Sequence, residues 1–346
     1  MCSTPATLRR TKRSLRTWPG ARLLGALGLI TALAGGGAAW AAPLDHTQTP
    51  VRRFGMLPTP YVTAFLRTRM VERAELGPHD WRTHEGEYTG LMYSCQGGFL
   101  DLDHVRDAAD WYAHLHRQVA AAVQAGAREL SVDSADRDTT LGLRWQRPPE
   151  ADAAAVAAAV DTMSTQLTWW MLTWHEVITW LGFSRVPPFS ERASAFSYED
   201  EYSHLVGLQV GRRALQRPEP WNQAVTLELD AQLAALGAAS KNTALQALDR
   251  VKDQWWSSER SWPANAFVMR RHVALGIDEP LRPWLVPGLP DCPQASAVGW
   301  QLPALAPESW QASASLRTGW SGLRRQVSWP PAGLGAAATQ IGRAHV

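Results

Sequence analysis

The stretch "TWHEVITWLG" (residues 173–182) ends the longest helical pattern in the chain and decides how the fold is read. The pattern starts at Asp152, is rich in alanine at first and rich in tryptophan at the end, and stops at a glycine. A helix that is apolar on nearly every side belongs in a protein core rather than on a surface. The sequence therefore predicts a central helix over residues 152–181, which contains two ionisable residues, His175 and Glu176.

A second helix is predicted upstream, directly after a short strand. The strand covers residues 87–95 and ends on the turn Gly97–Gly98, and the helix follows over residues 100–126. Asp101 or Asp103 can cap this helix, because a carboxylate there accepts hydrogen bonds from the free amide groups of the first turn. The free amide groups of the glycine turn offer a place for an anion.

The remaining elements complete a mainly helical pattern. Alternating apolar residues on both sides of a polar turn predict a β-hairpin over residues 129–145. A third helix is expected to open at Ser197, with Asp200 as the acid of a capping box, and two more over residues 225–236 and 243–256. The expected fold is mainly α (α+β), a single helical domain with a small antiparallel β-hairpin or sheet.

The ends of the chain differ in composition from this middle. Residues 1–41 have a basic head, a short apolar middle and an A-x-A finish, which are the features of a secretory signal peptide. We therefore expect an exported protein, periplasmic or extracellular. The globular domain is expected over residues 42–290 and a Pro/Gly/Ala-rich tail over 291–340, while "IGRAHV" (341–346) reads like translated sequencing-adapter DNA.

Charge and hydropathy argue against two classes of partner. Glycines at 35–37 interrupt the first apolar run before the roughly 20 residues that a membrane span needs, so no stable span is expected after signal cleavage. The signal carries six basic residues and no acidic ones, which leaves 28 basic against 32 acidic side chains. A chain with this acidic balance has no basic patch for nucleic acid.

Each of three predicted helices carries a histidine with an acid beside it. Burying such groups is costly unless they pair with one another or bind a metal. Imidazole and carboxylate groups are what zinc, iron or manganese would take, so a divalent-metal site and a set of structural hydrogen bonds both stay open. The sets are His104 with Asp107, His175 with Glu176, and His204 with Asp200 and Glu201.

Two known metal motifs are matched only in part. Glu176 resembles the acid of the H-E-x-x-H zinc-protease helix, but Thr179 stands where the second histidine should be. Glu201 and His204 match half of the Glu-x-x-His pattern of di-iron bundles, and the second copy is missing. Neither motif assigns a metal.

The cysteines suggest a different chemistry. Cys95 and Cys292 remain after signal removal, and an oxidising compartment would allow one disulfide between them. As a free thiol before the glycine turn and a helix start, Cys95 could instead be an activated nucleophile with His175 as its base.

Parts of the chain resemble a known family. The stretches are "YSCQGGFLDLDHVRDAADW" (93–111), "WHEVITWLGF" (174–183) and "FSERASAFSYEDEYSHLVG" (189–207). They are similar to a family of secreted or envelope-associated bacterial proteins known as domain of unknown function 4056, and the likeness covers most of residues 50–290. The resemblance implies an envelope or extracellular location, no particular activity, and asparagine where this chain has His204. The positions that match the family motif are Gly97, Gly98, Asp101, His104, Arg106, Asp107, His175, Glu176 and Asp200.

These residues lead to one hypothesis and two alternatives. The hypothesis is a metal-assisted hydrolase acting on an envelope or extracellular substrate, with Glu176 as general base for a metal-bound water. The alternatives are a non-catalytic envelope protein whose polar residues form a buried network, and an amidase or peptidase with Cys95 as nucleophile. The expected metal ligands are His104, Asp107 and His175, and Arg106 or Arg192 would orient an anionic substrate.

Overall fold

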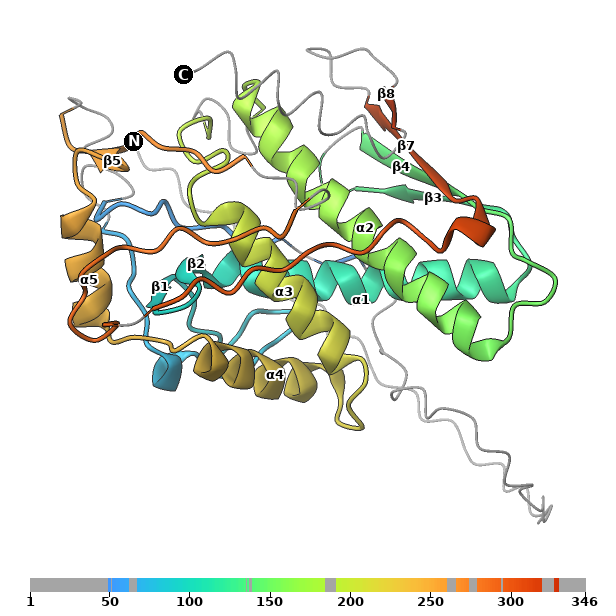
Figure 1. Cartoon of the computed structure of the whole chain (residues 1–346), viewed down its shortest axis with the longest axis horizontal. Helices are drawn as coiled ribbons and strands as arrows, with labels where there is room; N and C mark the ends of the chain where they lie inside the picture. Colours follow the sequence, from blue (N-terminus) through green and yellow to red (C-terminus); the bar gives the residue numbers. More distant parts are fainter. Residues whose placement is uncertain are drawn as a thin grey trace, which may run out of the picture. The chain divides into compact units, whose positions relative to one another are not determined.

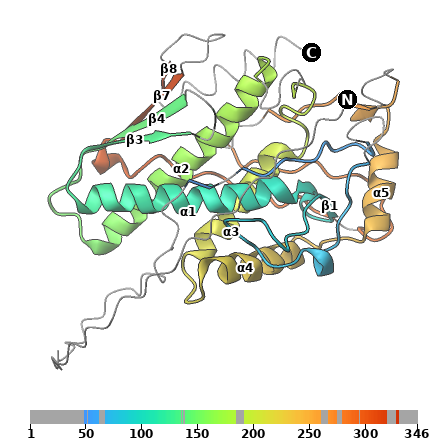
Figure 2. The same ribbon diagram turned by 180° about the vertical axis from the view of Figure 1, so that it is seen from behind.

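Two long helices cross a third on the same side and form the centre of the protein. Helices α2 (Ala153–Trp180) and α3 (Asp200–Ala214) both lie in front of α1 (Leu102–Gln124) in Figure 1 and behind it in Figure 2. Both helices pack against α1, and the fully buried Trp111 and Trp169 belong to the core cluster that they share. The fold is mainly helical with small antiparallel sheets, which confirms the predicted α+β class.

The computed structural model describes residues 49–50, 52–61, 67–134, 136, 139–183, 191–259, 266–273, 279–293, 295–318 and 327–329. The chain divides into two units, Met1–Ala39 and Trp40–Val346, and all of these residues fall in the second. The predicted signal peptide and the segment 341–346 lie outside the described residues. Within the described ranges, no helix combines the length and apolar character needed to cross a bilayer.

Helix α1 begins where its sequence predicts. Asp101 is the N-cap, and its carboxylate accepts a hydrogen bond from the backbone N–H of Asp103 at 2.9 Å. Before it, β1 (Leu91–Ser94) and β2 (Gly98–Asp101) pair as an antiparallel hairpin, whereas the sequence predicted only the first strand. Gly98 has φ of +63°, a conformation that L side chains rarely adopt, so glycine is required at this turn.

Helix α2 also confirms its prediction. Asp152 caps it by accepting a hydrogen bond from the N–H of Ala155 at 2.8 Å. Its second half is buried on nearly all sides, and Leu167, Trp169 and Leu172 have no exposed surface. Burying each such side chain stabilises the fold by about 1.5–3 kcal/mol.

Helix α3 starts three residues later than the sequence predicted, at Asp200. The Asp200 carboxylate accepts a hydrogen bond from the Ser197 N–H at 2.6 Å, as the acid of a capping box does. Two glycines then allow α3 to approach α1 closely: a Cβ on Gly207 would lie 2.2 Å from the Val105 carbonyl oxygen, and one on Gly211 would lie 2.9 Å from that of Ala109. The two remaining α-helices of the described part are α4 (Trp221–Ala235) and α5 (Lys241–Arg250).

The predicted hairpin belongs to a larger sheet. Strands β3 (Glu129–Asp133) and β4 (Thr139–Arg144) confirm it. With β7 (Ser313–Thr318) and β8 (Val327–Trp329) they form a sheet of strand order β3-β4-β7-β8. Strand β7 comes from the segment expected to be loop or tail: its Leu316 and Ala314 face Leu141 and Leu143 of β4. The other short elements are η1 (Arg73–Glu75), β5 (Trp256–Ser257), β6 (Phe267–Val268) and η2 (Glu308–Trp310).

A disulfide joins Cys95, at the end of β1, to Cys292, across a sequence separation of 197 residues. A cysteine in a disulfide has no free thiol, so the alternative of Cys95 as a nucleophile is wrong for this form of the protein. The bond instead fixes the segment after α5 to the β1–β2 turn.

Candidate functional site

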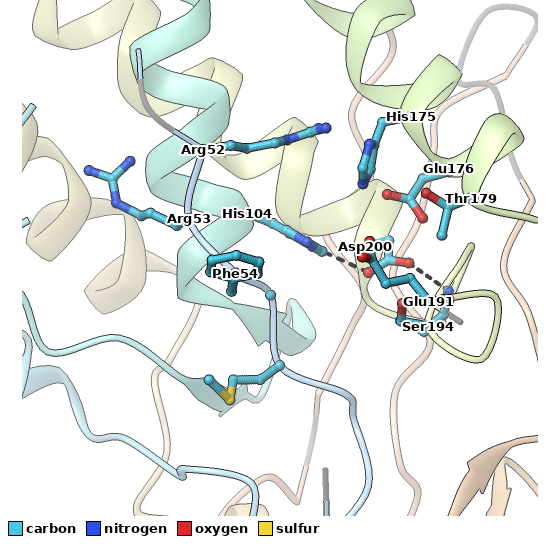
Figure 3. Close-up of a pocket in the computed structure, with 13 residues that line it drawn as sticks. Arg52, Arg53, Phe54, His104, His175, Glu176, Thr179, Glu191, Ser194 and Asp200 are labelled. Atoms are coloured by element: carbon cyan, nitrogen blue, oxygen red, sulfur yellow. Dashed lines mark hydrogen bonds and ion pairs between the residues drawn. The ribbon is translucent and has the colours of Figure 1, made fainter. Parts of the chain in front are cut away.

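A cavity of about 110 Å³ lies where α1, α2 and the start of α3 meet. Its wall includes residues 52–56, here called the N-terminal strap. The predicted residues His104, His175, Glu176 and Asp200 all line it. Figure 3 shows His104 pointing toward Asp200, with His175, Glu176 and Thr179 on the α2 side. The lining residues are Arg52, Arg53, Phe54, Gly55, Met56, His104, His175, Glu176, Thr179, Glu191, Ser194, Ser197 and Asp200.

His104 and Asp200 form an ion pair at the cavity wall. The His104 Nδ1 lies 3.3 Å from Asp200 Oδ1 and 4.0 Å from Asp101 Oδ2. Burial alone would lower the pKa of His104, but the carboxylates of Asp101 and Asp200 outweigh burial and hold it well above its usual value. The imidazole is therefore charged at neutral pH.

Glu176 is a buried acid beside this pair. Its side chain is almost completely removed from solvent, and its Oε2 accepts a hydrogen bond from the Phe196 N–H at 2.9 Å. Burial, followed by the negative charge of Asp200, raises the pKa of Glu176 to about 8. Glu176 is therefore predominantly a neutral carboxylic acid at pH 7, able to donate a proton.

A second layer of acids lies behind the cavity wall. Burial raises the pKa of Asp101 to about 6, and burial also raises the pKa values of Glu199 and Glu201 well above the usual range. His204 lies in the same layer, with its ring centroid 4.8 Å from that of His104. Burial, and then the charge of His104, lowers the pKa of His204 well below its usual value, so His204 is neutral. Glu201 and His204 do not line the cavity.

The strap and a loop orient the cavity histidines, and the sequence did not single out these residues. The His175 Nδ1 lies 2.8 Å from Asp136 Oδ1, and the same carboxylate oxygen lies 3.5 Å from Arg52 Nη1. A Cβ on Gly55 would lie only 2.4 Å from His104 Nε2, so glycine is needed where the strap passes this ring. No sequence motif pointed to Arg52, Gly55 or Asp136, because none lies in a periodic element.

Arg106 and Asp107 belong to a different cluster, which corrects the predicted site. Asp107 accepts hydrogen bonds from the backbone N–H and the guanidinium of Arg53, each at 3.0 Å. Arg106 donates to the Leu76 carbonyl at 2.9 Å and pairs with Glu87 at 3.3 Å. We call this cluster the ion network, and Figure 3 shows the Arg53 guanidinium pointing away from His104 and Asp200. Its members are Arg53, His79, Glu87, Arg106, Asp107 and Asp110.

The three predicted metal ligands do not all line the cavity: His104 and His175 do, and Asp107 does not. Asp107 pairs with Arg53 at 3.0 Å and with Arg52 at 3.7 Å, whereas His175 is paired with Asp136 and His104 with Asp200. Across the residues that the structure describes, no group of three or more His, Cys, Asp or Glu side chains is arranged to hold a metal ion. The ligand set His104, Asp107 and His175 is therefore not supported by the geometry.

The other predicted residues lie outside the cavity wall. The Arg192 guanidinium stacks on the Trp180 ring at 5.0 Å from its centroid, and Arg271 lies over the same ring at 4.5 Å. Gly97 and Gly98 form the β1–β2 turn beside the disulfide. None of Arg192, Gly97 and Gly98 is among the residues that line the cavity.

Comparison with known proteins places the chain in a family. The model of the family described as "Protein of unknown function (DUF4056)" matches residues 71–287, which include the β1–β2 hairpin, helices α1 to α5 and most of the cavity residues. No curated protein and no solved structure matches the chain. The match covers more than half of the chain, so the protein belongs to the DUF4056 family.

Proposed function

We propose that the protein is a hydrolase that performs acid–base chemistry in this cavity. One observation carries the proposal: the fold brings the buried acid Glu176 and the His104–Asp200 ion pair, from three separate helices, to one cavity. Ionisable groups that are buried together in a cavity, with their pKa values shifted, cluster at functional sites.

The groups divide the work of adding water across a bond. Asp200, held by His104, takes a proton from a water molecule as the water oxygen attacks the electrophilic centre of the substrate. The bond to the leaving group breaks, and Glu176 gives its proton to the leaving atom. The proton on Asp200 then returns to Glu176 through solvent, which restores both groups. A positioned acid or base of this kind contributes about 10²–10⁴-fold in rate.

This proposal revises the metal-assisted hypothesis. Its general base, Glu176, becomes a general acid, because burial beside Asp200 keeps the carboxyl protonated. A divalent metal remains a separate proposal, favoured by the histidines and acids at the cavity and opposed by the position of Asp107 outside its wall. Elemental analysis of the purified protein decides between them: near-stoichiometric zinc, iron or manganese that His104→Ala removes would favour the metal-assisted form.

Export and an envelope or extracellular substrate belong to the same proposal. The Cys95–Cys292 disulfide supports export, because disulfides persist in oxidising compartments such as the periplasm and are rare in the cytosol. The signal-peptide pattern of residues 1–41 supports it independently.

The first prediction tests the acid. Purified protein is assayed against chromogenic esters, anilides, glycosides and phosphodiesters, and against isolated cell-wall polymer. We expect turnover of one bond class, reduced at least about 100-fold by Glu176→Gln because glutamine cannot donate the proton. The rate should also fall as the pH rises past about 8, where the carboxyl ionises.

Glu201→Gln is the matched control, because Glu201 is an equally buried acid that does not line the cavity. It should keep most of the activity. If no bond class is turned over, or if both variants lose activity equally, the buried-network alternative is correct and the cavity is not catalytic.

A further inference from the structure

Thr179 has a hydroxyl group without a hydrogen-bond partner among the residues that the structure describes. The residue is only 2% exposed, and its Oγ1 is buried with no hydrogen-bond partner in the part of the chain that the structure describes. Other hydroxyls of α2 bond to the carbonyl four residues earlier: Ser164 to Val160 at 2.6 Å and Thr168 to Ser164 at 2.8 Å. A buried polar group without a partner is rare and costs stability, so it calls for an explanation.

The position of Thr179 supplies that explanation. Thr179 follows Glu176 by three residues and His175 by four, so all three share a face of α2. All three line the cavity, and Figure 3 shows Thr179 beside Glu176. Thr179 is thus part of the wall of the cavity in which the proposed reaction would occur.

We propose that Thr179 is a substrate-positioning residue whose hydroxyl donates a hydrogen bond to a carbonyl oxygen of the group that enters the cavity. This inference rests on the proposed function and adds a substrate class to it. The cavity volume of about 110 Å³ is comparable with the roughly 150 Å³ that encloses a benzene molecule, so a small amide or ester group fits inside it.

The test compares two isosteric substitutions on the same helix. Thr179→Val removes a hydroxyl without a partner, so the melting temperature of the ligand-free protein should stay the same or rise by about 2–4 °C. Thr168→Val removes a hydroxyl that donates to the Ser164 carbonyl, so its melting temperature should fall. If Thr179→Val lowers the melting temperature as Thr168→Val does, the hydroxyl has a structural partner and the inference is wrong.

Acetamide, which carries a carbonyl group and is small enough for the cavity, is the binding probe. Titrated at millimolar to molar concentration, it should raise the melting temperature of the wild type, Thr168→Val and Thr179→Ser, and Thr179→Val should lose at least about tenfold in affinity. Absence of acetamide binding to the wild type, or equal binding to Thr179→Val, overturns the inference.

The result separates this inference from the proposed function. Acetamide binding that depends on Thr179, in a protein that turns over no substrate, would support the carbonyl site and reject the hydrolase. Turnover that depends on Glu176 and is unchanged in KM by Thr179→Val would support the hydrolase and reject the role of Thr179.

Discussion

At Glu176, the chemistry proposed for the residue opposes the stability of the fold. The carboxyl is buried beside the negative charge of Asp200, so ionising it in the folded protein is unfavourable. A purely structural position could carry glutamine, which would accept the same hydrogen bond from the Phe196 N–H without this cost. A glutamate here is best explained by a need for a proton that can leave and return.

Glu176→Gln should therefore stabilise the protein at high pH. The pKa of Glu176 is about 8 in the folded state and about 4.3 in the unfolded state, so between these values the folded state binds the extra proton. The free energy of unfolding of the wild type consequently falls as pH rises from about 4 to about 8, and Glu176→Gln escapes this loss. Urea unfolding at pH 4 and pH 9 should show similar stabilities at pH 4 and a more stable variant at pH 9.

Glu75→Gln provides a control of opposite sign. The exposed Glu75 pairs with Lys241 at 2.6 Å, and this contact lowers the pKa of the carboxyl, so removing its charge should not stabilise the protein at any pH. A difference between wild type and Glu176→Gln that stays constant with pH would contradict the raised pKa.

The sequence predicted several of the cavity residues and grouped Asp107 with them, although Asp107 does not line the cavity. His104, His175, Glu176 and Asp200 were found because each lies on a helix beside another ionisable group. Asp107 was expected beside His104 because residues three apart lie on the same face of a helix. Helical spacing does not show which side chains from other segments pack against that face. The residues that approach Asp107 are Arg53 and Arg52, from a strap without periodic sequence.

The helices with clear capping residues and apolar patterns in their own sequence were predictable. Helices α1 and α2 have capping acids and long apolar patterns, so their bounds agree closely with the prediction. Strand β7 has two buried apolar residues and becomes a strand by pairing with β4, a contact that its own sequence does not encode. The close crossing of α1 and α3 was also invisible, although it sets the spacing of His104 and His204.

Gly207→Ala tests that crossing. A Cβ there would lie 2.2 Å from the Val105 carbonyl oxygen and 2.6 Å from the Ala108 Cβ, so the helices must separate. Overpacking of this kind costs about 1–3 kcal/mol or more, and the displacement should reduce activity as well. Thermal unfolding should show a large loss for Gly207→Ala, a smaller one for Gly211→Ala and almost none for Gln209→Ala, which is half-buried on the same helix. Equal stability of Gly207→Ala and wild type would disprove the close contact.

At the scale of the whole described unit, the C-terminal segment holds the site helices in place. This segment covers the described residues 279–293 and 295–318, and in Figure 1 its orange-red trace runs from the side of α5 across the front of α3 and α2 to β7. The Tyr202 hydroxyl donates to the Val298 carbonyl at 2.7 Å, and the Tyr202 ring stacks on Trp300 with centroids 5.6 Å apart. Gln166 of α2 donates to the Pro303 carbonyl. One end of this segment is anchored by the disulfide and the other by β7, so the disulfide contributes to the position of the cavity helices from a distance.

Loss of the disulfide should therefore lower stability more than it changes the chemistry of the site. A bond across 197 residues restricts the unfolded chain strongly, and removing a native disulfide typically costs about 2–5 kcal/mol. We expect the double variant Cys95→Ser/Cys292→Ser to melt on the order of 5–15 °C below the wild type. A reducing agent should lower the wild-type melting temperature to the same value and leave the variant unchanged, because only the wild type has the bond to lose.

Below its melting temperature the variant should keep the activity of the wild type within a few fold, since neither sulfur lines the cavity. A complete loss of activity in the folded variant would return Cys95 to the list of catalytic candidates, and an unchanged melting temperature would show that β7 alone anchors the segment.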